Sequence, residues 1–562
     1  MNMQSIRLMV TLAGIGGLLW STTSVYGQGN DVAPYNDSIL EADLKADLFF
    51  FASDAMKGRQ TATPENFLAA EYIKSKFERL GLKTVGPEGS YFQDYNLIQA
   101  TLGEENLLEL TRSENASIRL RPGQDYYPHR SSPSSRVSGT VVFAGFGISA
   151  PKLGYDDFKG DSFEGKIVLV LDNEPGSKDP KSPFEGIIRS QYSSSLLKTL
   201  TAQEKGAIGI VFVQDVHNQT GPGNFEAQAK RYWPEEPGRR QRYELATRVE
   251  KIRIPVAQVS PSLAETLVEG TGRSLEDLAK AAETESGMSP VPLPGIQVEI
   301  TTGVDRHIVH DRNVVALIEG ADESVKDEWV ILCGHYDHVG VDASGNTFNG
   351  ADDDGSGTVA LFEIAEAYAL AAKEGKRPRR SILLAAWNSE EAGLLGSWAY
   401  AEHPLTPLSK TVAVLNMDMI GRNEGVPENG GRRFRGLEPQ TSESNRNSVI
   451  IVGHTFSDDL LSEVEKANQV TALELKTGYD HNLTSILRRS DQWPFLQKDV
   501  PAFLFTTGFH PDYHTVNDDP QKINYEKFQN IVRLIHQLSW NLANQDSRPK
   551  MNSDRLKTTT NP

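Results

Sequence analysis

The sequence predicts an α/β fold, a three-layer sandwich in which helices cover both faces of a mixed, largely parallel central sheet. Two observations carry this prediction. Nearly continuous apolar runs recur in the second half of the chain, as is typical of strands buried on both faces. These runs lie at 313–318, 329–333, 381–387, 412–417, 448–452 and 501–505. Helical apolar spacing separates them at 358–373, 393–401, 459–468 and 525–544, which gives the alternation expected of βα units.

The first hundred residues supply outer elements of the same domain. Residues 43–82 contain two helical patterns, which a polar loop at 53–59 separates and Gly81 ends. Short strands are expected at 91–97 and 107–110. A stretch rich in Pro, Ser, Arg and Tyr at 122–136 is typical of a domain boundary.

Residues 137–294 differ from their surroundings and are interpreted as an inserted, smaller, β-rich module. The predicted strands lie at 139–144, 166–171, 207–213 and 254–259, and the predicted helices at 197–206 and 261–269. No dense cluster of histidines and carboxylates occurs in this region, so a non-catalytic module is expected. The main domain then comprises residues 28–136 and 295–545. A polar tail at 546–562 is expected to be disordered.

The N-terminal 27 residues have the pattern of a secretory signal peptide. Arg7 supplies a positive start, residues 8–20 are apolar, and small residues precede a cleavage point after Gly27. The apolar stretch is shorter than the roughly 20 residues that a spanning helix needs. We therefore expect an exported protein, periplasmic or secreted, with no transmembrane segment in its mature form.

Charge and cysteine content narrow the function classes. The chain has 562 residues, enough for two or three domains, and a formal net charge of −18. Such an acidic chain is a poor partner for nucleic acid or an anionic membrane surface. Cys333 is the single cysteine, so no intrachain disulfide can form, and its apolar context predicts a core residue.

The segment 333–357 carries the first group of chemically interesting side chains. In it, His335, Asp337 and His338 follow directly after an apolar run. A loop rich in Gly, Asn and Ser follows, and then come three adjacent aspartates at 352–354. Adjacent carboxylates repel one another. Between a buried strand and a helix start, a divalent cation explains them better than water alone.

Four further side chains follow other predicted strands: Glu390, Glu391, Asp418 and His514. Because the carboxyl ends of parallel strands meet at one edge of a sheet, we expect these groups to converge there with the first. Together they form a mixed nitrogen and oxygen set that suits zinc. His338, together with two other histidines at 310 and 481, is interpreted as a loop or pocket-wall residue.

Five motifs resemble, in order, the site motifs of the co-catalytic di-zinc aminopeptidases. They are Gly-His-Tyr-Asp at 334–337, Asn-Gly-Ala-Asp-Asp-Asp-Gly-Ser-Gly at 349–357, Asn-Ser-Glu-Glu at 388–391, Asn-Met-Asp at 416–418 and Tyr-His-Thr at 513–515. The wider group includes bacterial leucyl aminopeptidase, glutamate carboxypeptidase and the transferrin receptor. The resemblance covers about 43–97 and 297–542 and implies a zinc-peptidase fold. The module between them resembles a protease-associated domain.

The resemblance implies a role for each matching position. Asp353 would bridge two zinc ions, His335 and Asp418 would complete one of them, and Glu391 and His514 the other. The peptide bond after Asp353 would be cis.

The remaining implied roles concern catalysis and substrate binding. Glu390 would be the general base, and Asp337 would accept the spare ring N–H of His335. Tyr513 is a candidate donor to the reacting carbonyl oxygen. Asp491 is a candidate partner for a substrate amine, although Ser490 and Asp491 equally suit a helix start.

The predicted function is that of an exported, zinc-dependent aminopeptidase. It would hydrolyse the N-terminal peptide bond of peptides through a metal-bridged water activated by Glu390. A carboxypeptidase of the glutamate type, or a dipeptidase, is the main alternative, and Arg422, Arg488 and Arg489 keep it open. Glutaminyl cyclase uses one zinc, which the full ligand set disfavours.

A receptor-like binding protein without metals would have lost some of these ligands, and all five positions are kept. The sequence leaves open the preferred side chain, the role of the module and the oligomeric state, a dimer being one option.

Overall fold

The structure is a computed structural model that describes residues 32–553. It leaves out 113–115, 161–162, 180, 185, 187–188, 219–222, 236–237, 239–240, 424, 427, 429–433, 435–436 and 483. The predicted signal peptide lies outside the described residues. Within the described part, none of the helices combines the length and the apolar character needed to cross a bilayer.

The central sheet has nine strands and is parallel in its middle, which confirms the predicted fold class. The strands, in spatial order, are β10 (Tyr243–Leu245), β1 (Phe92–Leu102), β13 (Val304–Ile318), β15 (Ser381–Trp387), β14 (Trp329–His335), β16 (Thr411–Met417), β19 (Ala502–Thr506), β17 (Ser448–Val452) and β18 (Glu474–Lys476). The four strands from β15 to β19 run parallel. Antiparallel pairs flank them, β13 with β15 and β17 with β19.

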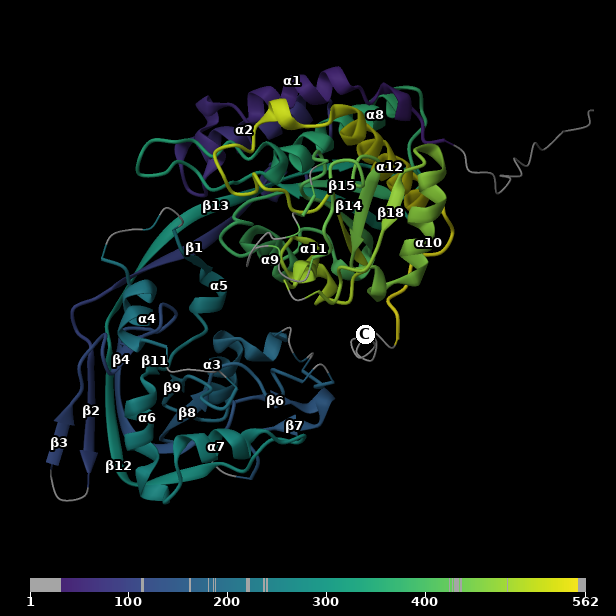
Figure 1. Cartoon of the computed structure of the whole chain (residues 1–562). Helices are drawn as coiled ribbons and strands as arrows, with labels where there is room; N and C mark the ends of the chain where they lie inside the picture. Colours follow the sequence, from purple (N-terminus) through teal and green to yellow (C-terminus); the bar gives the residue numbers. More distant parts are fainter. Residues whose placement is uncertain are drawn as a thin grey trace, which may run out of the picture. The chain divides into compact units, whose positions relative to one another are not determined.

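Helices cover both faces of this sheet (Figure 1). One layer contains α1 (Glu41–Phe51), α2 (Pro64–Arg79), α8 (Gly357–Lys373), α10 (Asp458–Ala467) and α12 (Tyr525–Asn544), and the other contains α9 (Leu395–Glu402) and α11 (Gln492–Leu496). Side chains of β14 alternate between the layers. Val330 and Leu332 join the first core, and Ile331 and Cys333 the second. Cys333 is a buried core residue, as predicted.

The helix boundaries follow from local sequence. The Thr63 side chain accepts a hydrogen bond from the Asn66 N–H at the start of α2, and Pro64 occupies the first helical turn. Gly81, two residues beyond the end of α2, has a φ of +72°, which suits its predicted role as a stop. On α12 the buried Phe528, Ile531 and Ile535 recur at helical spacing and pack on the sheet.

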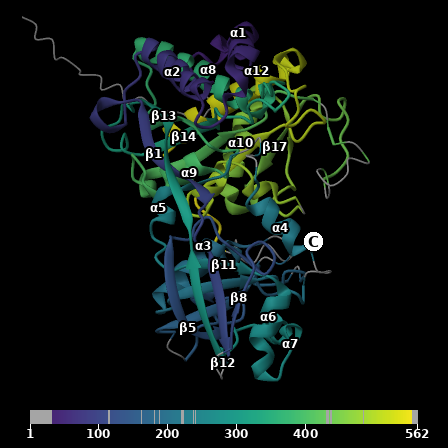
Figure 2. The same cartoon turned by 90° about the vertical axis from the view of Figure 1, so that its left-hand side faces the viewer.

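A second sheet of eight strands contains most of the segment that was expected to be an inserted module. Its order is β3 (Ala116–Arg119), β2 (Leu107–Arg112), β12 (Val291–Thr302), β5 (Ser135–Phe143), β8 (Lys166–Leu171), β9 (Gly209–Val213), β11 (Val256–Val259) and β4 (Tyr126–Pro128). A two-stranded ribbon joins β6 (Ser149–Ala150) to β7 (Tyr155–Asp156). The helices are α3 (Ser195–Glu204), α4 (Phe225–Tyr232), α6 (Pro261–Val268) and α7 (Leu275–Ala282); α6 and α7 pack on the sheet (Figure 2). The short helix α5 (Ala246–Val249) packs instead on Ile98 of β1 in the central sheet.

The second sheet extends beyond both predicted boundaries of the module. Strands β2, β3 and β4 precede residue 137 and β12 continues past residue 294, yet all four belong to the second sheet. In the other direction, β10 lies within the predicted module but pairs with β1 of the central sheet. The second sheet therefore extends beyond the predicted limits, because strand pairing between distant segments leaves no mark on local composition.

The first part of the polar tail is ordered, contrary to expectation. The Ser457 hydroxyl donates to the Lys550 carbonyl, and the Asn552 N–H donates to the Phe456 carbonyl. Arg548 forms an ion pair with Glu328 at 2.5 Å. Composition alone suggested disorder, whereas these contacts with residues about a hundred positions or more away hold 546–553 in place.

Glu363, buried on α8, gives a prediction about stability and pH. Burial, and secondly the charge of Asp43, raise its pKa from 4.5 to about 8. The unfolded chain therefore ionises more readily than the folded one, and this group lowers stability as pH rises from about 4.5 to 8. We expect Glu363→Gln to raise the free energy of unfolding by roughly 1–3 kcal/mol at pH 8 and by much less at pH 5. Urea unfolding at both pH values measures this.

The matched control is Glu366→Gln on the same helix. The Glu366 side chain is 46% exposed and pairs with Arg79. This exposed pair is expected to contribute less than about 1 kcal/mol. An equal gain for both variants at both pH values would contradict the assignment to Glu363.

Candidate metal centre

The predicted site residues meet at one edge of the central sheet, where its parallel strands end. His335 is the last residue of β14, and Asp418 directly follows β16. Glu390 lies three residues beyond β15, and His514 lies in the loop after β19. The convergence expected from strand ends is therefore present in the structure.

Three side chains form a first donor group around His335. Its Nε2 atom lies 3.3 Å from Oδ1 of Asp353, 3.8 Å from Oδ1 of Asp418 and 3.8 Å from Oε2 of Glu390. The ligand atoms of His335, Glu390 and Asp418 all lie within 4.8 Å of one another. This spacing leaves room for one cation among them.

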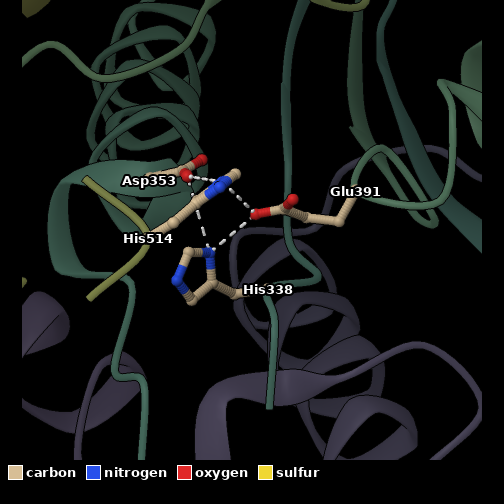
Figure 3. Close-up of side chains that lie close together, drawn as sticks. All are labelled: His338, Asp353, Glu391 and His514. Atoms are coloured by element: carbon tan, nitrogen blue, oxygen red, sulfur yellow. Dashed lines mark ion pairs between the residues drawn. The ribbon is translucent and has the colours of Figure 1, made fainter. Parts of the chain in front are cut away.

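A second donor group lies on the other side of Asp353 (Figure 3). The Nε2 atom of His514 is 2.8 Å from Oδ2 of Asp353 and 2.8 Å from Oε1 of Glu391. His338 completes this group, with its Nδ1 atom 3.1 Å from the same Glu391 oxygen. Asp353 therefore presents one oxygen to each donor group, as expected of a bridging carboxylate.

The sequence interpretation made His338 a loop or pocket-wall residue, and the structure places it in the loop after β14, among the donor atoms of the second group. It is 1% exposed and lies within 4.8 Å of the donor atoms of Asp353, Glu391 and His514. The motif comparison ended at Asp337 and passed over the next residue. The signal that could have found it is its position three residues after His335 in the same loop. His310 and His481 lie outside both donor groups.

Backbone hydrogen bonds fix the three adjacent aspartates in different directions. Asp354 accepts the N–H groups of His335 and Gly357, at 2.9 and 2.8 Å. Asp518 accepts the N–H of Asp352 and of Asp353. The peptide bond between Asp353 and Asp354 is cis, as predicted. Only Asp353 of the three belongs to a donor group.

Asp337 orients the two glutamates. Its carboxylate accepts the N–H of Glu390 at 3.0 Å and that of Glu391 at 3.2 Å. The Nδ1 atom of His335 lies 3.0 Å from the Asp337 backbone carbonyl and 3.6 Å from its carboxylate. The spare N–H of His335 thus faces the carbonyl, rather than the carboxylate that was expected.

Several supporting residues were missed by sequence reasoning. Arg59, in the loop interpreted as merely polar, is fully buried and donates to the carbonyls of Asn349 and Gly350. Asp311 accepts hydrogen bonds from Ser389 and Asn388, beside the glutamate pair. Such residues show no periodicity, because each acts through a partner far away in the chain.

Comparison with known proteins gives a family match for the segment that contains the site. Residues 313–539 match the family described as Peptidase family M28, and this segment contains every residue of both donor groups. The chain carries an M28 peptidase domain. The resemblance inferred from the five motifs is confirmed for this segment.

The M28 domain also relates the chain to individual proteins. A protein described as "Probable glutamate carboxypeptidase" from Arabidopsis thaliana is 28% identical over 458 residues, 80% of this chain and 59% of the relative. The chain thus spans about three fifths of that relative's length. An aminopeptidase from Mus musculus is 35% identical over 150 residues, 26% of this chain and 18% of the relative. Among solved structures, an aminopeptidase from Aneurinibacillus sp. strain AM-1 has a TM-score of 0.48 at 18% identity, covering 92% of this chain and 97% of that one.

The donor set of the M28 domain fits a metal centre. Four carboxylates and three imidazoles gather there: Asp353, Glu390, Glu391, Asp418, His335, His338 and His514. Most of these side chains are buried, so the negative charge of the carboxylates has to be balanced by cations nearby. Among the described residues the Nε2 atom of His335 has no hydrogen-bond partner, although three carboxylate oxygens lie within 3.8 Å. A mixed nitrogen and oxygen set of this kind suits zinc.

The two adjacent glutamates of the M28 domain differ electrostatically. Burial raises the pKa of Glu390 well above its ordinary value, and the charges of Glu391 and Asp418 add to the shift. For Glu391, burial is the largest effect and acts in the same direction, but the charge of His514 and the side-chain contacts with His338 and His514 together outweigh it and lower the pKa. Glu390 therefore has the higher proton affinity of the two neighbours, which suits an acid–base group beside a ligand.

A recess of about 640 Å³, counted up to its open mouth, lies beside the first donor group of the M28 domain. Asp353, Glu390 and Asp418 line one part of it. Its other walls are mostly apolar and include Met419, Ile450, Val452, Ile486, Leu504 and Phe509. The mixed lining of apolar walls with a few polar groups is typical of a small-ligand pocket.

The structure brings Tyr513 to this recess but not Asp491. The Tyr513 ring stacks on His514 with centroids 3.7 Å apart, and its hydroxyl lies 3.3 Å from Nη2 of Arg489. Asp491 is fully buried and accepts a hydrogen bond from Ser397. It precedes α11 but makes no capping bond, whereas Ser490 donates to Oδ2 of Asp418 at 2.5 Å.

Proposed function

We propose that this protein is a zinc-dependent aminopeptidase with two zinc ions per chain. The observation that carries the proposal is the recess, which places an apolar wall directly beside Asp353, Glu390 and Asp418. A substrate with a positive α-amine and an apolar side chain matches both parts of that lining. The M28 family match and the donor geometry support the metal centre.

In this proposal each donor group would hold one ion, and Asp353 would contribute an oxygen to both. Zinc would supply Lewis-acid chemistry, polarising the scissile carbonyl and making a nearby water more acidic. Glu390 takes a proton from the attacking water and delivers it to the leaving amine, a role to which its raised pKa is suited. Asp337 acts by holding the backbone of the glutamate pair.

Tyr513 is proposed to help bind the reacting carbonyl oxygen. Its hydroxyl is oriented by Arg489, and the ring lies against the recess. A phenolic O–H can donate one hydrogen bond to a developing oxyanion. Asp491 has no proposed contact with substrate, since its side chain is fully buried.

The recess predicts a preference for large apolar N-terminal residues. Burying leucine in place of alanine stabilises the complex by about 1.5–2 kcal/mol, which corresponds to about 10- to 30-fold in kcat/KM. We expect leucyl, methionyl and phenylalanyl substrates to exceed alanyl ones by this factor. Glutamyl substrates are expected to be poorer still, because an apolar wall desolvates their carboxylate. Kinetics with a panel of aminoacyl amides measure the series, and equal rates for alanyl and leucyl substrates would contradict it.

A specific observation favours carboxypeptidase activity as the second candidate. Of the three arginines considered from sequence, Arg489 lines the recess, and no carboxylate among the described residues pairs with it. Arg422 is 1% exposed and pairs with Asp512, and the Arg488 guanidinium lies over Trp493. A substrate carboxylate could therefore bind at Arg489, as a glutamate carboxypeptidase or a dipeptidase would require.

Blocked peptides separate the two candidates. An aminopeptidase cleaves C-terminally amidated peptides and leaves N-acetylated ones intact, while a carboxypeptidase does the reverse. Arg489→Gln is expected to change the aminopeptidase reaction by less than about tenfold, and to abolish the carboxypeptidase reaction. Undiminished turnover after treatment with a zinc chelator would contradict the metal-dependent mechanism itself.

We further propose that the protein is exported by residues 1–27. The support is the positively charged start, the apolar stretch and the small residues before Gln28. N-terminal sequencing of protein recovered from the periplasm or the medium tests this. An unprocessed N-terminus in the cytoplasmic fraction would contradict it.

A further inference from the structure

His338 lies beside the proposed ion sites, although it is not one of the five ligands expected from the sequence. It lies in the loop after β14 and faces the second donor group (Figure 3). Its Nδ1 atom is 3.1 Å from Oε1 of Glu391 and 3.7 Å from Oδ2 of Asp353. The donor atoms of His338, Asp353, Glu391 and His514 all lie within 4.8 Å of one another.

The surroundings of His338 give its ring nitrogens no other partner. The side chain is 1% exposed, and among the described residues neither ring nitrogen makes a hydrogen bond. Its nearest polar neighbour is Oε1 of Glu391 at 3.1 Å, which is itself a donor atom of the same group. A buried polar atom without a partner costs roughly 1–3 kcal/mol, so such atoms usually serve a ligand or an ion.

We propose that His338 is a fourth protein ligand of the ion held by Asp353, Glu391 and His514. The inference rests on the proposed metal-dependent function and deepens it. With His338 included, the two ion sites differ in their number of protein ligands. The second site takes four protein donors, and the first takes His335, Asp418 and one oxygen of Asp353.

This inequality has a functional consequence. A zinc site with four protein ligands is closed, whereas one with three keeps a position for water or substrate. The open position then belongs to the first site, which also contains Glu390 and borders the recess. The site that includes His338 is expected to bind its ion more tightly and to serve mainly in holding Asp353 and Glu391 in place.

X-ray absorption on the zinc-loaded wild-type protein tests the proposal directly. Ligation by His335, His338 and His514 places three imidazoles on two zinc ions, and absence of His338 leaves two. This measurement needs no variant, so a folding defect cannot obscure it. A count of two imidazoles in the wild type would overturn the proposal.

Zinc affinity of His338→Phe gives a second readout. Phenylalanine keeps an aromatic ring but offers no nitrogen. We expect one zinc per chain to weaken by more than about 100-fold in equilibrium dialysis against a chelator, since loss of a supporting contact alone costs about 10- to 100-fold. The matched control is His536→Phe on α12, a histidine that is equally buried and belongs to neither donor group.

The outcomes separate this inference from the proposed function. Two tightly bound zinc ions in His338→Phe, together with peptide cleavage by the wild type, would overturn only the role of His338. Three imidazoles on two zinc ions in a wild type that cleaves no peptide would instead overturn the proposed activity. Equal zinc loss in His536→Phe would assign the effect to packing and would also overturn the role of His338.

Discussion

Glu390→Gln is expected to lower kcat by about 10²- to 10⁴-fold while zinc content stays at the wild-type level. Glutamine keeps the size of the side chain but cannot take up a proton from the attacking water. Burial and neighbouring carboxylates raise the pKa of Glu390, which suits a group that exchanges a proton with substrate. Steady-state kinetics on an apolar aminoacyl substrate, with zinc measured in the same sample, give both quantities.

The adjacent glutamate provides the matched control. Glu391 lies 2.8 Å from His514 and belongs to the second donor group. Glu391→Gln is therefore expected to lose zinc, and its activity should partly return when zinc is added in excess. If Glu390→Gln also lost zinc and recovered with added zinc, Glu390 would be a ligand and not the base. Full activity in Glu390→Gln would remove its catalytic role altogether.

Asp353→Asn is expected to reduce zinc content to at most one ion per chain and to abolish detectable peptidase activity. The two oxygens of Asp353 face different donor groups, at 3.3 Å from His335 and 2.8 Å from His514. An amide offers only one oxygen as a ligand and no negative charge, so it cannot serve both ions. Metal analysis after gel filtration in a weak chelator, followed by kinetics, measures the two effects.

Asp352→Asn is the control for this change, since it alters the same residue type one position earlier. Oδ1 of Asp352 accepts the Gly421 N–H at 2.6 Å, and an asparagine oxygen can still do so. Its other oxygen lies 3.4 Å from His510, and it belongs to neither donor group. Two zinc ions should therefore remain. Equal zinc loss in both variants would mean that Asp353 acts through the fold of the loop and not as a ligand.

The central sheet and the candidate site were largely predictable because their signals are local. The boundaries of β15, β17 and α12 coincide with the apolar runs and helical spacing from which they were predicted. The site motifs at 334–337, 388–391 and 416–418 lie at strand ends, and the topology of parallel strands brings such ends together. The same logic failed for the inserted module, where β2 and β12 belong to a sheet whose membership depends on pairing between distant segments.

The sequence by itself determined the α/β class, the order of the strands along the chain and, with the exception of His338, the residues that converge as donors. The tertiary structure decided which neighbours support them. Arg59 contacts carbonyls about 290 residues away, and His338 meets Glu391 and His514 only when three loops are packed together. Apolar periodicity reports which face of an element is buried. It carries no information about a polar side chain whose partner is supplied by another segment, because that contact exists only in the folded chain.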